Sequence, residues 1–219
     1  MSISRPQLFM SRKGFSLIEV VLAIGIFLVT VLALVGLLGP TLRSIDEVEK
    51  TDEVASIVNT INAFLQNSYD IAPGASKFDA IYNAVVSQDH ATLLVFRAYD
   101  NNDLISLKIG FVAETNAAAQ VSVADIYSGS NMLAAGTIYR AVLTPSSVNP
   151  TAEMTDAGVE NFPRYKMKAS TPAAYPEGSF AMEVRIFAED PSLNFKVESN
   201  LNTLSTEEPI FTYNTAIVR

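Results

Sequence analysis

The stretch that decides the fold is residues 15–39, which read FSLIEVVLAIGIFLVTVLALVGLLG. From Val20 to Leu42 there are 23 residues without a charge. As a helix they would span roughly 35 Å, compared with about 30 Å for the hydrocarbon core of a bilayer. A helix of a soluble domain is rarely apolar on all sides over that length. The sequence therefore predicts one membrane-spanning helix over residues 15–42.

The alternative for an apolar stretch near the N-terminus is a secretory signal peptide. This stretch exceeds the usual apolar region of about 7–15 residues, and no A-x-A cleavage pattern follows, since residues 39–41 read Gly-Pro-Thr. Positive charges stay on the cytoplasmic side of a membrane. Arg5, Arg12 and Lys13 therefore place the N-terminus in the cytoplasm and the rest of the chain outside.

One carboxylate, that of Glu19, lies near the start of the apolar run. An ionised carboxylate in hydrocarbon is costly, and residues of this kind usually have a partner. A membrane anchor alone has no use for such a group. Glu19 is therefore a candidate functional residue.

The residues around Glu19 resemble a known family. Residues 12–20, RKGFSLIEV, are similar to the cleavage and methylation motif of type IV prepilins and type II secretion pseudopilins. In that family a prepilin peptidase cuts after a glycine that ends a short basic leader, and the next residue is N-methylated. The resemblance implies a leader over residues 1–14, cleavage between Gly14 and Phe15, N-methylation of Phe15, and a role for Glu19 in filament assembly.

The resemblance also implies a function and a location. The chain would be a structural subunit, a minor pilin or pseudopilin, of a type IV pilus or type II secretion-like filament. Its expected partners are a prepilin peptidase, other pilin or pseudopilin subunits, and the bacterial inner membrane. It would cross that membrane once, with its C-terminal head in the periplasm or outside the cell, and then enter a filament. Glu19 would pair with the α-amine of a neighbouring subunit, because an unpaired buried charge is expensive.

One feature departs from the family pattern of major pilins. These often carry a helix-weakening proline at the position that Gly36 occupies here, whereas the proline of this helix comes four residues later, at Pro40. Proline removes one helical hydrogen bond, so a kink or melted turn is expected near Pro40. The departure favours the minor, pilin-like branch.

The helical pattern resumes after Pro40 and predicts an amphipathic half of the same helix, ending near Tyr69. Its apolar stripe comprises Ile45, Val48, Ala55, Val58, Ile61, Phe64 and Leu65. The opposite side, over residues 46–53, is acidic and is interpreted as a solvated face rather than a partner surface. A shorter helix is expected at Lys77–Val86, with Ser76 as its N-cap and Asp79 three residues on.

From residue 91 the apolar period changes to two, which is typical of strands. The alternation of apolar and other residues from Ile105 to Phe111 predicts a half-buried strand. The polar run Asp100–Asp103 before it predicts a hairpin turn. Further strands are expected at Val121–Ala124, Thr137–Leu143, Phe180–Phe187 and Ile210–Val218, with long irregular connections over residues 114–136 and 144–178. The predicted fold class is α+β: a long N-terminal helix packed on a C-terminal antiparallel sheet, with the head spanning residues 43–219.

Composition excludes several kinds of site. The chain has no cysteine and one histidine, which excludes thiolate metal sites and multi-histidine sites. Asp100–Asp103 is rich in oxygen ligands but lacks the spacing of a calcium loop, so neither a metal nor a cofactor is predicted. The net charge of -8, which becomes -11 without the leader, argues against nucleic acid as a partner.

The remaining candidate residues are His90, residues 207–209, Tyr165 and Tyr175. His90 lacks a recognisable nucleophile pattern around it, so no enzyme activity is predicted and an anchored exoenzyme is the least favoured alternative. Residues 207–209, Glu-Glu-Pro, are expected to form a surface turn. Tyr165 and Tyr175 lie in a polar segment and could form a partner surface. The main alternative function is a membrane-anchored adhesion or DNA-uptake module that uses the prepilin pathway.

Overall fold

The computed structural model describes residues 14–66, 76–99, 104–112, 120–149, 152–154, 163–168, 171–192, 195–197, 204 and 206–219. The chain divides into two compact units, an N-terminal unit (Met1–Glu53) and a C-terminal unit (Val54–Arg219). A long helix begins in the first unit, and strands of one main sheet dominate the second. The α+β class predicted from the sequence is confirmed.

The long helix is α1 (Leu17–Gln66), and its first part is apolar on every side. Residues Leu17–Leu38 have a mean hydropathy of 3.0 and are long and apolar enough to cross a membrane. The hydroxyl of Thr30 donates to the carbonyl of Ile26 at 2.8 Å, so this polar group is satisfied within the helix. The melted turn expected near Pro40 is not present, because the backbone stays helical from Leu17 to Gln66.

The last turns of α1 belong to the C-terminal unit and pack on its sheet. Ile57, Ile61 and Leu65 recur every four residues and are buried, with Val58 and Phe64 half-buried beside them. The predicted stripe was correct from Val58 onward, but it missed Ile57 and wrongly included the exposed Val48 and Ala55. The side chain of Ile45, also part of the predicted stripe, lies outside those described. The predicted helix end near Tyr69 lies outside the described residues.

The polar side chain of Asn62 ties this part of α1 to the last strand, β10 (Phe211–Val218). The hydroxyls of Tyr213 and Thr215 lie 3.4 and 3.1 Å from Asn62 Oδ1. Burial raises the pKa of Tyr213 to about 12.

The second helix, α2 (Lys77–Gln88), begins where the sequence predicted. The hydroxyl of Ser76 accepts a hydrogen bond from the backbone N–H of Asp79 at 3.0 Å, which confirms the N-cap. The helix runs two residues beyond the predicted end at Val86. It ends at Asp89, whose φ of 66° is a left-handed conformation that closes the last helical turn.

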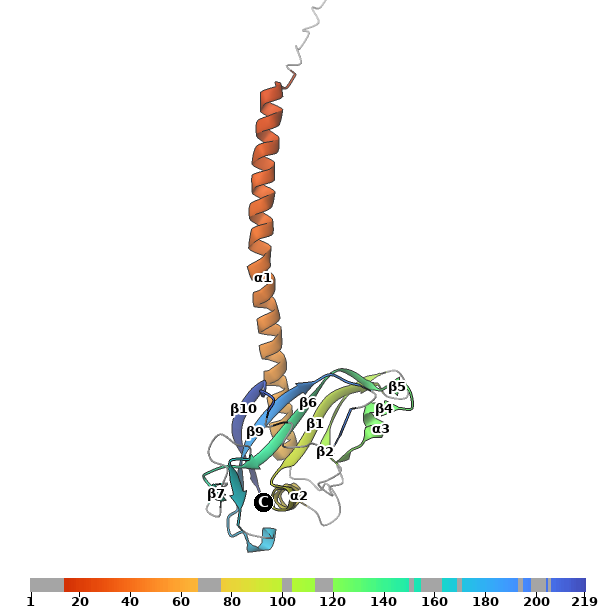
Figure 1. Ribbon diagram of the computed structural model, residues 1–219, viewed down its shortest axis with the longest axis vertical. Coiled ribbons are helices and arrows are strands. Elements are labelled where there is room, and N and C mark those ends of the chain that lie inside the picture. Colours follow the sequence, from red (N-terminus) through yellow and green to blue (C-terminus); the bar gives the residue numbers. More distant parts are fainter. Residues whose placement is uncertain are drawn as a thin grey trace, which may run out of the picture. The chain divides into compact units, whose positions relative to one another are not determined.

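The main sheet has six strands in the order β10-β9-β6-β1-β2-β3 (Figure 1). Its strands besides β10 are β1 (Ala91–Tyr99), β2 (Ile105–Val112), β3 (Gln120–Val121), β6 (Ala134–Pro145) and β9 (Ser179–Glu189). All neighbours pair antiparallel except the short β3, which runs parallel to β2. The four long strands expected from residue 105 onward are therefore present, with β6 and β9 longer than predicted.

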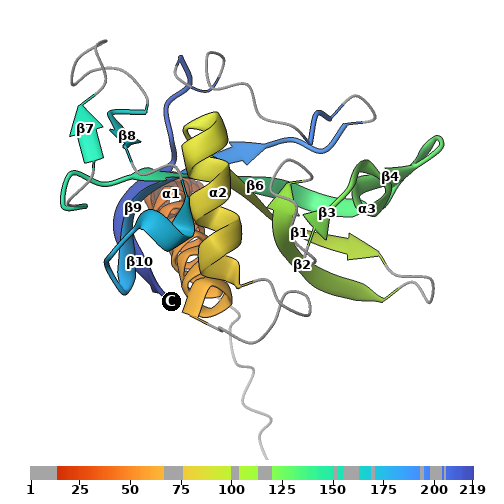
Figure 2. The same cartoon turned by 90° about the horizontal axis from the view of Figure 1, so that it is seen from below.

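Both faces of the sheet are covered near its centre, which explains why β1 is buried on both sides. Leu93 and Val95 face the core beneath α1 and α2, whereas Leu94 and Phe96 face a second core that includes Ile126. Figure 2 shows α2 lying across the first of these faces. A strand with both faces covered has a continuous apolar run, which is the pattern of residues 93–96.

The connections contain more regular structure than the sequence predicted. The expected strand Val121–Ala124 is wrong beyond its first residue: β3 ends at Val121, and α3 (Val123–Ile126) follows. The backbone N–H of Ser122 donates to Asp125 Oδ2 at 2.8 Å and so favours helix at this point. The parts predicted to be irregular contain two small antiparallel strand pairs and one 3-10 turn. One pair is β4 (Tyr127–Ser128) with β5 (Asn131–Met132), and the other is β7 (Ala152–Met154) with β8 (Tyr165–Met167). The 3-10 turn is η2 (Pro172–Ala174).

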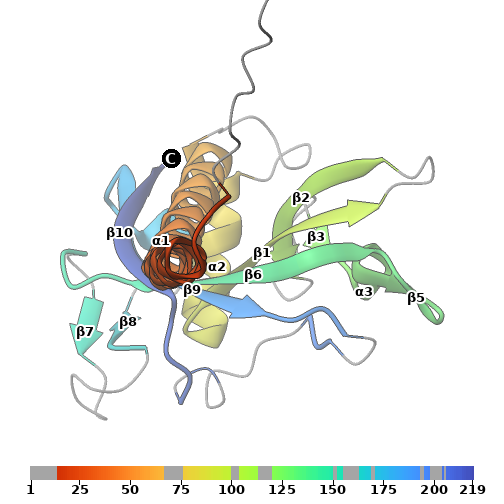
Figure 3. The same cartoon turned by 90° about the horizontal axis from the view of Figure 1, so that it is seen from above.

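The first half of β2 differs from the half-buried strand that was predicted. Phe111 is fully buried, but Ile105 and Leu107 are 56% and 51% exposed. Tyr99, opposite Ile105 on β1, and Leu104 are exposed as well. Figure 3 shows the far end of β1 and β2 extending away from α2. Among the described residues, neither Ile105 nor Leu107 belongs to the core that α1 and α2 cover. The predicted turn Asp100–Asp103 lies outside the described residues.

Candidate functional site

The Gly14–Phe15 bond precedes the start of α1. Residues 14–16 are not helical, and the helix begins at Leu17. Phe15 is 86% exposed, and Leu17 and Ile18 are exposed as well. The structure thus brings the three predicted site residues, Gly14, Phe15 and Glu19, into one short segment, with the candidate cleavage bond outside the helix.

Gly14 is not required by the chain's own packing. A Cβ atom added at this position would meet nothing within 4 Å, and Gly14 is not among the positive-φ glycines. An alanine would therefore be tolerated by the described structure at this position.

Glu19 interacts with Ser16 in a capping box at the start of α1. The backbone N–H and the hydroxyl of Ser16 donate to Glu19 Oε2 at 3.0 and 3.2 Å. In return, the backbone N–H of Glu19 lies 3.3 Å from Ser16 Oγ. The first turn of a helix leaves backbone N–H groups without helical partners, and a capping box satisfies two of them.

Sequence reasoning missed the role of Ser16, although the signal was present. The pattern S-x-x-E followed by an apolar run is the sequence signature of a capping box. The carboxylate also lies at the partly positive end of the helix, where a negative charge is favourable. A plain membrane anchor could therefore use Glu19 as a helix cap, contrary to the expectation that it has no use for this group.

The other residues weighed from the sequence lie in the C-terminal unit. His90 is buried just before β1, with Nδ1 2.8 Å from the carbonyl oxygen of Gln88. Burial lowers the pKa of His90; the Gln88 contact and the charge of Asp89 act in the opposite direction. Residues 207 and 208 are exposed before β10, as expected of a surface turn.

Tyr175 is not part of an exposed partner surface, so that prediction is wrong. It is 1% exposed and packs among Phe78, Tyr82 and Phe180, with ring centroids 5.1 to 6.2 Å from its own. Its hydroxyl lies 3.0 Å from the carbonyl oxygen of Ser179. The hydroxyl is thereby satisfied, so the ring can enter the core although it lies in a segment that was predicted to be irregular. Tyr165, in β8, is half-buried.

A buried arginine, Arg140, was not singled out from the sequence. It is 3% exposed and forms a bidentate ion pair with Glu189, in which Nη2 donates to Oε2 at 3.1 Å. Two further donors reach the carbonyl oxygens of Lys196 and Val197, each at 2.7 Å. With these partners Arg140 attaches residues 195–197 to the sheet, which is a structural role.

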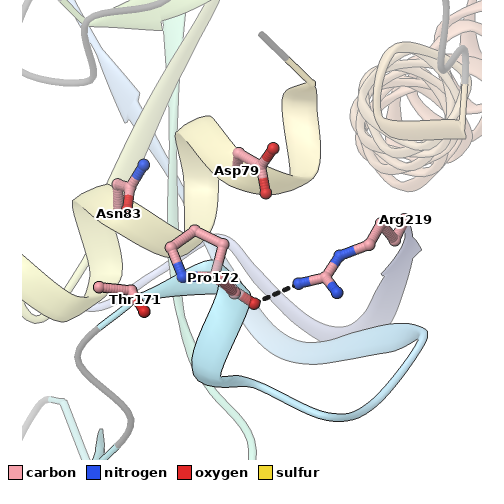
Figure 4. A pocket seen from close by; sticks show the side chains of 6 residues that line it. Asp79, Asn83, Thr171, Pro172 and Arg219 are labelled. Atoms are coloured by element: carbon pink, nitrogen blue, oxygen red, sulfur yellow. Dashed lines mark hydrogen bonds between the residues drawn. The ribbon is translucent and has the colours of Figure 1, made fainter.

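The C-terminal unit also has a shallow pocket of about 470 Å³ (Figure 4). It lies between α2 and η2, and its lining comprises Asp79, Asn83, Thr171, Pro172, Ala173 and Arg219. The guanidinium of Arg219 donates to the carbonyl of Pro172 and lies 4.7 Å from the ring centre of Phe78. Within the described residues, no group of three His, Cys, Asp or Glu side chains could hold a metal ion.

Comparisons with known proteins give no further guidance. No protein-family model matches the chain, and neither do the curated proteins or the solved structures. The candidate site therefore depends on its own residues and geometry.

Proposed function

We propose that this chain is a structural subunit, a minor pilin or pseudopilin, of a type IV pilus or type II secretion-like filament. The observation that carries the proposal is the Gly14–Phe15 junction, which lies outside the helix and just before an apolar span whose one charged residue, Glu19, is in its first turn. A prepilin peptidase would cut this junction, and the new N-terminus at Phe15 would be methylated.

The exposure of the N-terminal span supports an assembly role. Every side chain from Gly14 to Leu38 is exposed in the chain by itself. Apolar surface of this extent is unfavourable in water, so it needs lipid or other apolar helices around it. A bilayer would cover it before assembly, and the same helices of neighbouring subunits would cover it in a filament.

Glu19 gives such an assembly its register. The α-amine freed at Phe15 is a cation, and Glu19 of a neighbouring subunit is the carboxylate able to pair with it in a dry core. Because an unpaired buried charge is strongly unfavourable, helices packed with the wrong stagger would be rejected.

A second candidate is a membrane-anchored adhesion or uptake module, and the pocket beside α2 favours it. The lining offers a carboxylate, an amide, a hydroxyl and a guanidinium from Asp79, Asn83, Thr171 and Arg219, which could contact a polar ligand. Nucleic acid remains an unfavourable ligand for a chain of net charge -8.

Determination of the mature N-terminus in the native host tests the proposal. The full chain is purified from membranes, and its intact mass and N-terminal sequence are measured. We expect a chain that begins with methylated Phe15. Gly14→Ala is the control for packing, because the described structure tolerates an alanine at this position. The bulkier Gly14→Leu should accumulate as the uncut precursor.

Three outcomes would contradict the proposal. A mature start near residue 40 would indicate an ordinary signal peptide, and an intact N-terminus in wild type would indicate a plain anchor. Equal processing of Gly14→Leu and wild type would show that no enzyme recognises the glycine.

A further inference from the structure

The pocket between α2 and η2 is lined by two groups of opposite charge, the carboxylate of Asp79 and the guanidinium of Arg219. They form no ion pair with each other, and within the described residues neither forms one with a third residue. The carboxylate accepts no hydrogen bond there either, because the contact of Asp79 with Ser76 uses its backbone N–H. Both charges are therefore available to a ligand.

The Arg219 side chain is held in place without using most of its donors. One Nη2 donor goes to the carbonyl of Pro172 (Figure 4), and the guanidinium lies 4.7 Å from the ring centre of Phe78. The backbone N–H of Arg219 donates to the carbonyl of Gly178 at 2.9 Å, which fixes the main chain at this position. A guanidinium has five N–H groups, so most remain for a ligand, and little side-chain entropy is lost when a ligand binds.

Asp79 by itself does not require a ligand. A carboxylate in the first turn of a helix is stabilised by the helix dipole, and Asp79 lies in the first turn of α2. Arg219 is independent of that helix, because it follows β10, and it brings the opposite charge to the same pocket. Asn83, one turn after Asp79, adds a side-chain amide that has no partner among the described residues. The pocket thus combines a cation, an anion and an amide from two separate elements.

We propose that this pocket binds a small zwitterion of the amino-acid class, whose carboxylate contacts Arg219 and whose ammonium group contacts Asp79. Such a ligand compensates both charges at once, whereas a singly charged ligand would leave one of them covered and uncompensated. A guanidinium also matches a carboxylate in shape, because two parallel N–H groups can contact its two oxygens. The volume of about 470 Å³ suits a ligand of this size.

A neutral sugar fits this lining less well. It would remove water from two charges without supplying an opposite charge to either. None of the lining residues in the described part of the chain is aromatic, and the Arg219 guanidinium lies over the nearby Phe78 ring, so a sugar has no aromatic face to stack on. The inference rests on the second candidate function, a module that contacts a polar ligand, and is independent of filament assembly.

Binding of L-alanine to the full chain in detergent tests the inference, measured by saturation-transfer NMR titration. Propionate and ethylamine are the matched controls, because each carries one of the two charges of alanine. We expect alanine to bind at least about tenfold more tightly than either, the factor that one additional charge-assisted hydrogen bond provides. Absence of alanine binding, equal affinity for the three compounds, or tighter binding of glucose would overturn the inference.

Three variants assign the two ends of the ligand. Asp79→Asn keeps the shape of the side chain and should weaken the binding of alanine and ethylamine at least about tenfold, with propionate unchanged. Arg219→Gln should weaken alanine and propionate by a similar factor and leave ethylamine unchanged. Glu177→Gln is the control: its exposed carboxylate lies near the pocket, since its charge and that of Arg219 both act on Tyr175, but it does not line the pocket. Glu177→Gln should therefore bind all three compounds as wild type does.

Tyrosine near-ultraviolet circular dichroism checks that each variant is folded. If Arg219→Gln alters the spectrum, the opposite responses of ethylamine and propionate in Asp79→Asn still decide the outcome. An equal loss of alanine binding in Glu177→Gln and Asp79→Asn would show a general effect of charge and overturn the inference. Failure of the inference leaves the proposed filament function standing, because cleavage after Gly14 is measured separately.

Discussion

Glu19 can serve as a helix cap or as the partner of a neighbouring α-amine, and two substitutions distinguish these roles. Glu19→Gln keeps an oxygen that can accept from the Ser16 N–H and hydroxyl, so the contacts now 3.0 and 3.2 Å long can persist. It removes only the charge. Glu19→Ala removes both the capping contacts and the charge.

The expected magnitudes of the two effects are far apart. Loss of a capping interaction costs about 0.5–2 kcal/mol, a factor of roughly 2 to 30 in an equilibrium. Loss of one member of a buried ion pair costs about 3–5 kcal/mol, because the other charge stays buried, which corresponds to more than a hundredfold. A pairing role therefore predicts that Glu19→Gln and Glu19→Ala both lower filament recovery at least a hundredfold.

The assay is the ratio of protein in sheared filaments to protein in the membrane fraction, measured by immunoblot over a dilution series. Cleavage after Gly14 is the internal control, since both variants should still start at Phe15 and still reside in the membrane. Near-normal recovery of Glu19→Gln together with a modest loss for Glu19→Ala would refute the pairing argument. Glu19 would then be a helix cap only.

Two further predictions concern the C-terminal unit, tested by urea titration of the full chain in detergent with tyrosine near-ultraviolet circular dichroism. Asn149→Ala should lower the free energy of unfolding by about 3 kcal/mol. The buried amide of Asn149 forms hydrogen bonds with Ser146 and Ala181, and its removal leaves the Ala181 N–H unpaired. A decrease below about 0.5 kcal/mol would contradict this prediction. The pKa of buried His90 is lowered from 6.5, so its stabilising contribution is present above pH 6.5 and is lost as pH falls below it. In the His90→Asn variant the free energy of unfolding should therefore fall by less between pH 7 and pH 5 than it does in wild type. An equal fall in the two proteins would exclude His90 as the source of the pH dependence.

The regular elements of the fold were predictable because their signals are local. A Ser76 cap and the apolar spacing within α2 are encoded over a few residues, and both are present. The strand positions of β6, β9 and β10 follow equally from a period of two. Boundaries were less accurate, since helix ends such as Asp89 depend on a single backbone conformation.

Burial was predicted less well, because periodicity identifies a face but not what covers it. Ile105 and Leu107 have the spacing of a buried strand face, yet they extend beyond the helices and are exposed. Tyr175 lies in a segment without a strand or helix pattern, yet it fills a core between α2 and β9. Such contacts join residues far apart in the sequence, so no local pattern contains them.

The capping box also changes which part of the prepilin-like motif carries information. A serine and a glutamate three residues apart are expected at the start of many helices, so Ser16 and Glu19 can be explained without any filament. Gly14 has no such explanation within the described part of the chain, where a Cβ atom added at this position would meet nothing within 4 Å. A residue that the chain does not need for its own structure is the one that recognition by another molecule would explain. Processing at Gly14 is thus a more decisive test of the proposed function than the presence of Glu19.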